Sequence, residues 1–286
     1  MTIDIGSWLK ESASKLPEAD EAPLLSCQLL VGHVLGQPRS WVVAHPEILL
    51  TDQQLEKLRS LHKAFVRGTP LPYLLRHWEF YGLDFIVTPD VLIPRPETEL
   101  LVTTALDWLK FHPNQHNIAD VGTGSGCIAI ALAAKAAKAQ ISATDLSQPA
   151  LSIAQQNAGL HLVQNKIDFV HADLLPSDSL TFDMICANLP YIPTSKLATL
   201  PVSKFEPRLA LDGGPQGLTV IQRLLELSPS HLTSGGILLL EIEHEQKEAV
   251  IELAGSIFIG AAIQVLPDLA GHPRLLQIQT AEGMWL

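Results

Sequence analysis

The sequence predicts an α/β protein in which a mostly parallel β-sheet is covered by helices on both faces and is preceded by a small all-helical N-terminal domain. From residue 97 onward, short apolar segments alternate with helical segments, a pattern typical of parallel sheets buried on both faces. Residues 1–75 have apolar residues at helical spacing and no strand pattern. The last two predicted strands are joined by a loop too short for a crossover, so we expect one of them to run antiparallel.

The helical domain is predicted over residues 1–75. An apolar face from residue 24 to residue 34 ends at Gly36, a typical helix stop. Thr51 and Gln54 are spaced as a capping box, which predicts the start of a further helix. A structural cap and a partner-binding module are both compatible with such a bundle.

Residues 76–96 predict a β-hairpin linker. Aromatic and β-branched residues from 78 to 87 flank a central Gly82, as expected for two short strands joined by a turn. A stiff segment containing Pro94 and Pro96 follows, and Pro96 suits the first turn of a helix.

The sheet domain is predicted over residues 97–286, with no internal repeat and no low-complexity run. We expect its strands at 117–121, 140–145, 167–172, 182–187, 236–242, 262–266 and 275–280. We expect its helices at 127–139, 149–158, 218–227 and 246–254.

Composition and charge narrow the class of protein. The net charge of −11 argues against non-specific nucleic-acid binding, which depends on lysine and arginine neutralising phosphates. The three cysteines are far apart, so a disulfide framework is not expected and a reducing compartment fits. We find no signal-peptide pattern and no apolar run long enough to cross a bilayer. We therefore expect a cytoplasmic protein, and no metal site, because Pro113 interrupts the pair His112 and His116.

The segment Asn188-Leu189-Pro190-Tyr191 follows the predicted strand 182–187. It therefore lies at the carboxyl edge of the sheet, where open α/β sheets bind ligands. The Asn188 side-chain oxygen and the Leu189 carbonyl are neighbouring hydrogen-bond acceptors, which suits a planar NH2 group, and Tyr191 can supply a wall for it. The alternative is an ordinary strand-to-loop turn, because Asn and Pro are common turn residues.

A glycine-rich loop separates the first strand of the sheet from its helix. It consists of Gly122, Thr123, Gly124, Ser125 and Gly126. Such a loop lets a ligand approach the backbone N–H groups at a helix start, although Cys127 stands where the dinucleotide fingerprint has its third glycine. Asp145 and Asp173 end the next two strands, and Asp145 is placed to bind ribose hydroxyls. Together they favour a nucleoside-containing cofactor; the alternative for each carboxylate is a helix cap.

These residues resemble the class I S-adenosylmethionine-dependent methyltransferases that methylate planar nitrogens. A narrower resemblance, to the release factor glutamine methyltransferases, rests on residues 93–99 (Ile-Pro-Arg-Pro-Glu-Thr-Glu), 205–214 (Phe-Glu-Pro-Arg-Leu-Ala-Leu-Asp-Gly-Gly) and 268–274 (Asp-Leu-Ala-Gly-His-Pro-Arg). The resemblance covers essentially the whole chain, with its segments in the family's order. One departure is Leu189, where the family's Asn-Pro-Pro-Tyr motif has its first Pro. The carbonyl that the family uses at this position is retained.

The resemblance implies a Rossmann-like seven-stranded mixed sheet and S-adenosylmethionine as the cofactor. It implies that the cofactor lies over Gly122–Gly126, with its ribose at Asp145 and its adenine near Asp173 and Leu174. The implied catalytic residues are Asn188, Leu189, Pro190 and Tyr191, with Asn188 also beside the cofactor.

The reaction that the resemblance implies is methyl transfer to the side-chain nitrogen of glutamine in the Gly-Gly-Gln motif of peptide chain release factors, which supports translation termination. Residues 1–75 are then expected to select the protein substrate. We expect a monomer with no direct nucleic-acid or membrane partner. The alternatives are an adenine-N6 or other nucleic-acid base methyltransferase, which must flip its base, and a cofactor-binding protein without activity.

Overall fold

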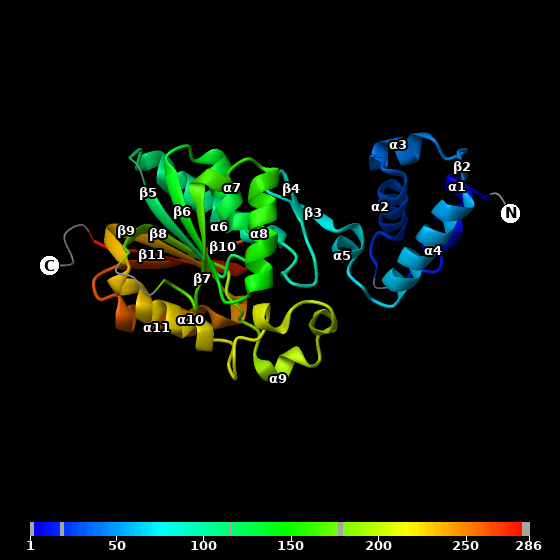
Figure 1. Ribbon diagram of the computed structural model, residues 1–286. Coiled ribbons are helices and arrows are strands. Elements are labelled where there is room, and N and C mark those ends of the chain that lie inside the picture. The colour runs from blue at the N-terminus through cyan, green and yellow to red at the C-terminus, as the bar shows by residue number, and fades with distance from the viewer. Residues whose placement is uncertain (1–2, 18–19, 115, 177–179, 282–286) are drawn as a thin grey trace. The chain divides into compact units, whose positions relative to one another are not determined.

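Figure 1 shows the computed structural model, which describes residues 3–17, 20–114, 116–176 and 180–281. The chain forms two compact units, Met1–His77 and Trp78–Leu286. Among the described residues, no helix combines the length and the apolar character needed to cross a membrane.

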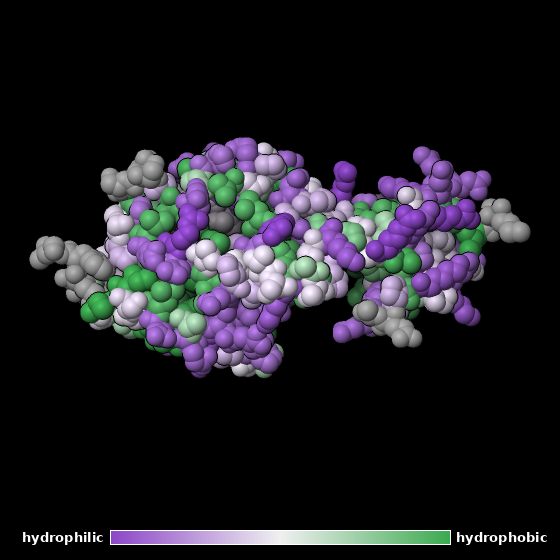
Figure 2. All heavy atoms as spheres, turned by 90° about the horizontal axis from the view of Figure 1, so that it is seen from below, coloured by the Kyte–Doolittle hydropathy of each residue, from purple (hydrophilic) through white to green (hydrophobic). Residues whose placement is uncertain are grey.

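The first unit is a bundle of short helices. They are α1 (Ile5–Ala13), α2 (Pro23–Leu35), α3 (Arg39–Ala44), α4 (Asp52–Val66) and α5 (Leu71–Leu75). The predicted stop at Gly36 is confirmed, because this glycine caps α2 in the left-handed conformation. The predicted capping box of Thr51 and Gln54 is also present at the start of α4. Polar side chains cover much of this unit on the face shown in Figure 2.

The helices of this unit enclose a small apolar core, to which Leu30 and Val31 of α2 contribute fully buried side chains. One detail differs from the sequence prediction. A two-residue strand, β1 (Ile3–Asp4), pairs antiparallel with β2 (Leu49–Leu50). Strands this short leave no period-two pattern in the sequence, which is why the sequence predicts helices alone.

The second unit contains the predicted seven-stranded mixed sheet. Its strands are β5 (His116–Val121), β6 (Ala139–Asp145), β7 (Ile167–His171), β8 (Phe182–Ala187), β9 (Leu232–Glu241), β10 (Ala262–Pro267) and β11 (Pro273–Gln279). They lie in the order β10-β11-β9-β8-β5-β6-β7. The contacts from β9 through to β7 are parallel, whereas β11 runs antiparallel to both of its neighbours. The predicted antiparallel strand is therefore confirmed.

Helices cover both faces of the sheet (Figure 1). They are α6 (Glu99–Phe111), α7 (Cys127–Lys135), α8 (Gln148–Leu160), α10 (Thr219–Leu227) and α11 (Lys247–Ile257). The short helix α9 (Thr194–Leu197) belongs to the segment that follows β8. Successive residues of β8 show the two-sided burial: Met184 packs in one apolar core with α6 and α7, and Ile185 packs in the other with α10 and α11. Both faces exclude water, so the polar groups at the strand ends are left to form a site at the sheet edge.

The predicted hairpin is present as β3 (His77–Phe80) and β4 (Leu83–Ile86). Phe80 and Phe85 are buried in the same core as α6 and α7. The side chain of Asn157 on α8 bonds both backbone groups of Ile86, at 2.7 and 3.0 Å, and donates to the Ser125 carbonyl at 2.8 Å. The hairpin is thus built into the second unit and tied to the glycine loop, while the domain boundaries at 75 and 96 stay predictions.

Two element boundaries differ from the sequence prediction by four residues, and the other differences are smaller. The helix predicted to residue 139 ends at Lys135, because Ala139 pairs with His116 as the first residue of β6. The strand predicted from 236 begins at Leu232, which pairs with Phe182 before an irregularity in the register. In both places pairing within the sheet overrides the local preference of the residues.

Candidate functional site

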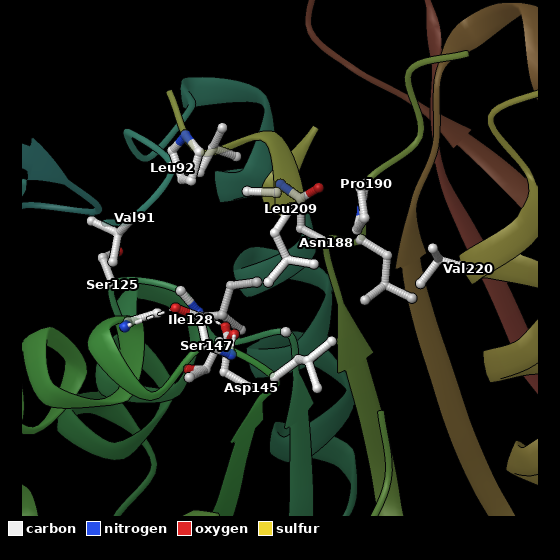
Figure 3. A pocket seen from close by; sticks show the side chains of 18 of the residues that line it. Val91, Leu92, Ser125, Ile128, Asp145, Ser147, Asn188, Pro190, Leu209 and Val220 are labelled. Carbon is white, nitrogen blue, oxygen red and sulfur yellow. Dashed lines mark hydrogen bonds between the residues drawn. The ribbon is translucent and has the colours of Figure 1, made fainter. Parts of the chain in front are cut away.

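A pocket lies at the carboxyl edge of the parallel strands. It is lined by residues that follow β5 (122–125), β6 (145–147), β7 (172–174) and β8 (188–190), together with residues 90–98 and 207–212. Figure 3 shows Asp145 and Ser147 on one side of the hollow and Asn188, Pro190 and Leu209 across it. The topology therefore brings together the glycine loop and the Asn188 segment, which are more than 60 residues apart in the sequence.

The glycine loop adopts a backbone that requires glycine. Gly122, Gly124 and Gly126 all have positive φ, at 72°, 55° and 82°. A Cβ on Gly126 would lie 2.9 Å from Ile130 and 3.1 Å from Ala154. Glycine is therefore needed both to turn the chain into α7 and to let α7 approach α8.

Asp120, just before this loop, stabilises it through hydrogen bonds. Its carboxylate is fully buried and accepts hydrogen bonds from the Thr123 hydroxyl at 2.6 Å and the Ala129 N–H at 3.1 Å. Burial raises the pKa of Asp120 to about 6, an effect opposed by these two hydrogen bonds. Asp120 is not among the site residues predicted from the sequence, although a carboxylate two residues before a glycine loop, at a strand end, is a signal for a supporting role.

Asp145 lies at the end of β6 facing the loop. One carboxylate oxygen accepts the Gly124 N–H at 2.8 Å, and the other accepts the Ser147 N–H at 2.8 Å. Burial raises the pKa of Asp145, and these backbone donors act against that rise. Each oxygen keeps a further acceptor site, so the carboxylate can bind a pair of hydroxyl groups within the pocket.

Asp173 and Leu174 line the same pocket after β7. The Asp173 carboxylate forms an ion pair with Arg223 at 2.8 Å, with both side chains about half exposed. Leu174 has a positive φ of 70°, and its carbonyl accepts the Thr144 hydroxyl at 2.6 Å. The ion pair with Arg223 was not foreseen from the sequence, because the two residues are 50 positions apart.

Asn188 is held from behind by two buried polar residues. Its side-chain N–H donates to the Thr98 hydroxyl at 3.0 Å, and that hydroxyl donates to the Glu241 carboxylate at 2.7 Å. Glu241 ends β9, and Thr98 ends the 3-10 turn η1 (Pro96–Thr98). No donor to the Asn188 side-chain oxygen or to the Leu189 carbonyl is found among the described residues. Two acceptors are therefore left for a ligand.

The three other predicted catalytic residues have different positions. Leu189 and Pro190 line the pocket, and the Leu189 side chain is buried against the glycine loop. The Tyr191 hydroxyl instead donates to Glu241 at 3.4 Å, and Tyr191 is not among the described residues that line the pocket. Burial, followed by the charge of Glu241, raises the pKa of Tyr191. The role of Tyr191 as a wall for the substrate amide stays a prediction.

Two long-range contacts near the pocket were missed by sequence reasoning. Thr98 reaches Glu241 across 143 residues, and Arg95 reaches the buried Glu206 across 111 residues at 2.5 Å. Thr98, Arg95 and Glu206 all belong to segments that carried the family resemblance. Glu241 had a signal of its own, because it ends a strand at the same sheet edge as Asn188.

The residues that line the pocket fit S-adenosylmethionine. The positive-φ glycines bring the backbone to the pocket wall without side chains, and the Asp145 carboxylate suits ribose hydroxyls. Apolar side chains such as Leu92, Leu174 and Val220 line the remaining wall. Within the described residues, no group of three His, Cys, Asp or Glu side chains is placed to hold a metal ion.

Comparison with known proteins identifies the family of this chain. The family model "PrmC N-terminal domain" matches residues 7–75, and "Ribosomal protein L11 methyltransferase (PrmA)" matches residues 97–200. A release factor glutamine methyltransferase of Moorella thermoacetica is 41% identical over 257 residues, which are 89% of this chain and 90% of the relative. The chain belongs to the release factor glutamine methyltransferase family. The Escherichia coli member is 39% identical, covering 85% of this chain and 87% of its own.

A solved structure supports the fold alone. An S-adenosylmethionine-dependent methyltransferase of Agrobacterium tumefaciens has a TM-score of 0.51 at 14% identity, over 72% of this chain and 70% of its own. The predicted class I methyltransferase fold is confirmed. As a family member, the chain is a methyltransferase that uses S-adenosylmethionine.

The departure from the family motif at Leu189 gives a testable expectation. We expect Leu189→Pro to change the transfer rate by less than about fivefold, since a compatible proline alters stability by about 0.4–1 kcal/mol and the carbonyl is kept. No hydrogen bond from the Leu189 N–H is found within the described chain. Steady-state kinetics with both substrates checks this, and a collapse of the rate would show that the Leu189 side chain has a role of its own.

Proposed function

We propose that this chain transfers a methyl group from S-adenosylmethionine to the side-chain amide nitrogen of a glutamine, in the Gly-Gly-Gln motif of peptide chain release factors. The observation that carries the proposal is the pair of acceptors, the Asn188 side-chain oxygen and the Leu189 carbonyl, beside the glycine loop. The relatives named release factor glutamine methyltransferase support the same substrate.

The two acceptors suit the chemistry of an amide. An amide nitrogen is a poor nucleophile because its lone pair is delocalised into the carbonyl. Its two N–H groups can donate to Asn188 and Leu189, which fixes the nitrogen in one orientation at the pocket wall. Most of the rate enhancement is then expected from positioning, since a well-oriented pair of reactants can gain about 7–11 kcal/mol.

The bound cofactor supplies an electrophilic methyl group on a positively charged sulfur. As the new N–C bond forms, the S–C bond breaks and its electron pair stays on sulfur, so that S-adenosylhomocysteine is the product. The nitrogen then loses one proton to water. Asn188 and Leu189 hold both N–H groups until the N–C bond has formed, and only then does one of them lose its proton, so a strong base is not needed earlier.

A comparison of substrates tests this function. Purified enzyme with methyl-labelled cofactor is expected to label intact release factor and to leave DNA and RNA unlabelled. The acidic composition and the helical N-terminal unit both favour the protein substrate. Label on a nucleic acid instead would establish the base methyltransferase alternative and overturn the proposal, and no label on any substrate would support a cofactor-binding protein without activity.

We further propose that residues 1–75 select the protein substrate and take no part in the chemistry. Within the described part of the chain, the residues that line the pocket lie in the second unit, between Asp90 and Arg223. A chain beginning at Trp78 is therefore expected to bind S-adenosylhomocysteine normally and to methylate release factor poorly. Calorimetric titration checks the binding of the cofactor product, and the transfer assay checks the methylation of release factor. Full activity of the shortened chain would refute this role.

We also propose that the enzyme is a cytoplasmic monomer.

A further inference from the structure

We infer that Thr98 and Glu241 are positioning residues that fix the Asn188 side chain with its oxygen directed at the substrate amide. The inference rests on the proposed function and extends it to two residues outside the Asn188 segment. Its basis is a chain of hydrogen bonds from Asn188 through Thr98 to Glu241, with distances of 3.0 and 2.7 Å.

The number of available hydrogens fixes which group donates in each hydrogen bond of the network formed by Asn188, Thr98 and Glu241. The Thr98 hydroxyl has a single hydrogen, and an ionised Glu241 can only accept. That hydrogen is therefore given to Glu241, so the Thr98 oxygen must accept from its other neighbour. The neighbour is the Asn188 side chain, which can donate through its NH2 group and not through its oxygen. The NH2 group consequently faces Thr98, and the oxygen faces away from it.

The reverse orientation of Asn188 would harm both ends of the network. Its oxygen would face the Thr98 oxygen, which has no hydrogen left to offer, and a buried polar group without a hydrogen-bond partner is destabilising. Its NH2 group would meet the NH2 group of the substrate glutamine, donor against donor. Thr98 and Glu241 therefore make the site specific for a ligand that brings N–H donors.

Burial and position support a positioning role for Glu241 and not direct contact with substrate. Its side chain is 1% exposed and it is not among the described residues that line the pocket. Its second oxygen accepts the Tyr191 hydroxyl at 3.4 Å. Glu241 thus joins Asn188 and Tyr191, the first and last residues of the segment predicted to be catalytic.

The charges around Glu241 make the orientation dependent on pH. Burial raises the pKa of Glu241 to about 7, with Glu97 adding to the rise and Arg274 of β11 opposing it. Tyr191 donates to Glu241, and the Cys127 thiol at the start of α7 also feels its charge. A protonated Glu241 can donate to Thr98, which frees the Thr98 hydrogen for the Asn188 oxygen and removes the preference for the productive orientation.

Substitutions at Thr98 test the inference. Thr98→Val keeps the shape and removes the hydroxyl, and we expect it to lower kcat by about tenfold to a hundredfold while the affinity for S-adenosylhomocysteine stays within about twofold. Thr98→Ser restores the hydroxyl and is expected to recover most of the rate. Thr104→Val is the matched control, because Thr104 lies on α6 and its hydroxyl donates to the carbonyl of Leu100 in the same helix. An unchanged kcat in Thr98→Val would overturn the inference.

Two further measurements distinguish positioning from a general loss of structure. In wild-type enzyme, kcat/KM is expected to fall below about pH 7, and Glu241→Gln is expected to abolish this acid limb, because Gln has no proton to gain. In the Asn188→Ala background, Thr98→Val is expected to cause no further loss, since it acts through Asn188. An acid limb that persists in Glu241→Gln, or losses that multiply in the double variant, would each contradict the inference.

These experiments distinguish a failure of the positioning inference from a failure of the proposed function. If wild-type enzyme methylates release factor while Thr98→Val and Glu241→Gln behave as wild type, the positioning inference alone is wrong. If wild-type enzyme methylates a nucleic-acid base instead, the proposed function is wrong. Thermal unfolding of each variant identifies a folding defect. If Thr98→Val has such a defect, the pH profile of Glu241→Gln tests the positioning inference instead.

Discussion

Replacing Asn188 by alanine is expected to lower the single-turnover rate of methyl transfer by about 10²-fold or more. The substitution removes the side-chain oxygen that we propose as an acceptor for one N–H of the substrate amide, and it leaves the Thr98 hydroxyl without its donor. The affinity for S-adenosylhomocysteine is expected to stay within a few-fold, because the glycine loop and Asp145 are unchanged. Rapid quenching with enzyme in excess over release factor measures the rate without product release.

Asn188→Asp provides a sharper comparison. It keeps an acceptor oxygen but adds a negative charge beside the positive sulfur of the cofactor, and its second oxygen faces the Thr98 oxygen without a hydrogen between them. We expect a rate well below that of wild type and a pH dependence that differs from the acid limb expected of the wild-type enzyme. A wild-type rate in Asn188→Ala would mean that the segment is a structural turn.

Replacing Asp145 by alanine is expected to weaken cofactor binding by about 10- to 150-fold, which corresponds to about 1.5–3 kcal/mol for a lost hydrogen bond to a charged group. The carboxylate bonds the N–H groups of Gly124 and Ser147, and its remaining acceptor sites are available to ribose hydroxyls. Calorimetric titration with S-adenosylhomocysteine measures the effect.

Two controls separate binding from folding in this experiment. Asp107→Ala removes a carboxylate that pairs with Lys110 on α6 and does not line this pocket, so its affinity for the cofactor product is expected to match wild type. Thermal unfolding of Asp145→Ala is expected to show a small change. Normal affinity in Asp145→Ala would show that the ribose is bound elsewhere.

Much of the fold follows from local patterns in the sequence. The strand 182–187 is predicted with its observed bounds, because its apolar run ends sharply at Asn188. The antiparallel end of the sheet follows from loop length alone. The pairing of β1 with β2 and the early end of α7 do not follow, because both depend on partners distant in the chain.

The sequence predicts the site residues at the strand ends, and it does not predict the residues that hold them in place. Asp145 and Asn188 follow strands directly, so the rule that ligands bind at the carboxyl edge selects them. Thr98 and Asn157 have no such pattern: each acts through a hydrogen bond to a residue more than 30 positions away. The sequence shows which groups face the ligand, whereas the packing shows which residues hold those groups in place.

Mapping the methylated atom by mass spectrometry tests the proposed reaction. Intact enzyme is incubated with cofactor and either natural release factor or a variant whose Gly-Gly-Gln glutamine is replaced by glutamate. The acceptor pair of Asn188 and Leu189 requires an NH2 group, so we expect one methyl group on the side-chain nitrogen of that glutamine and none on the glutamate variant. A methyl group on any other atom, or equal modification of both proteins, would contradict the assignment of this site.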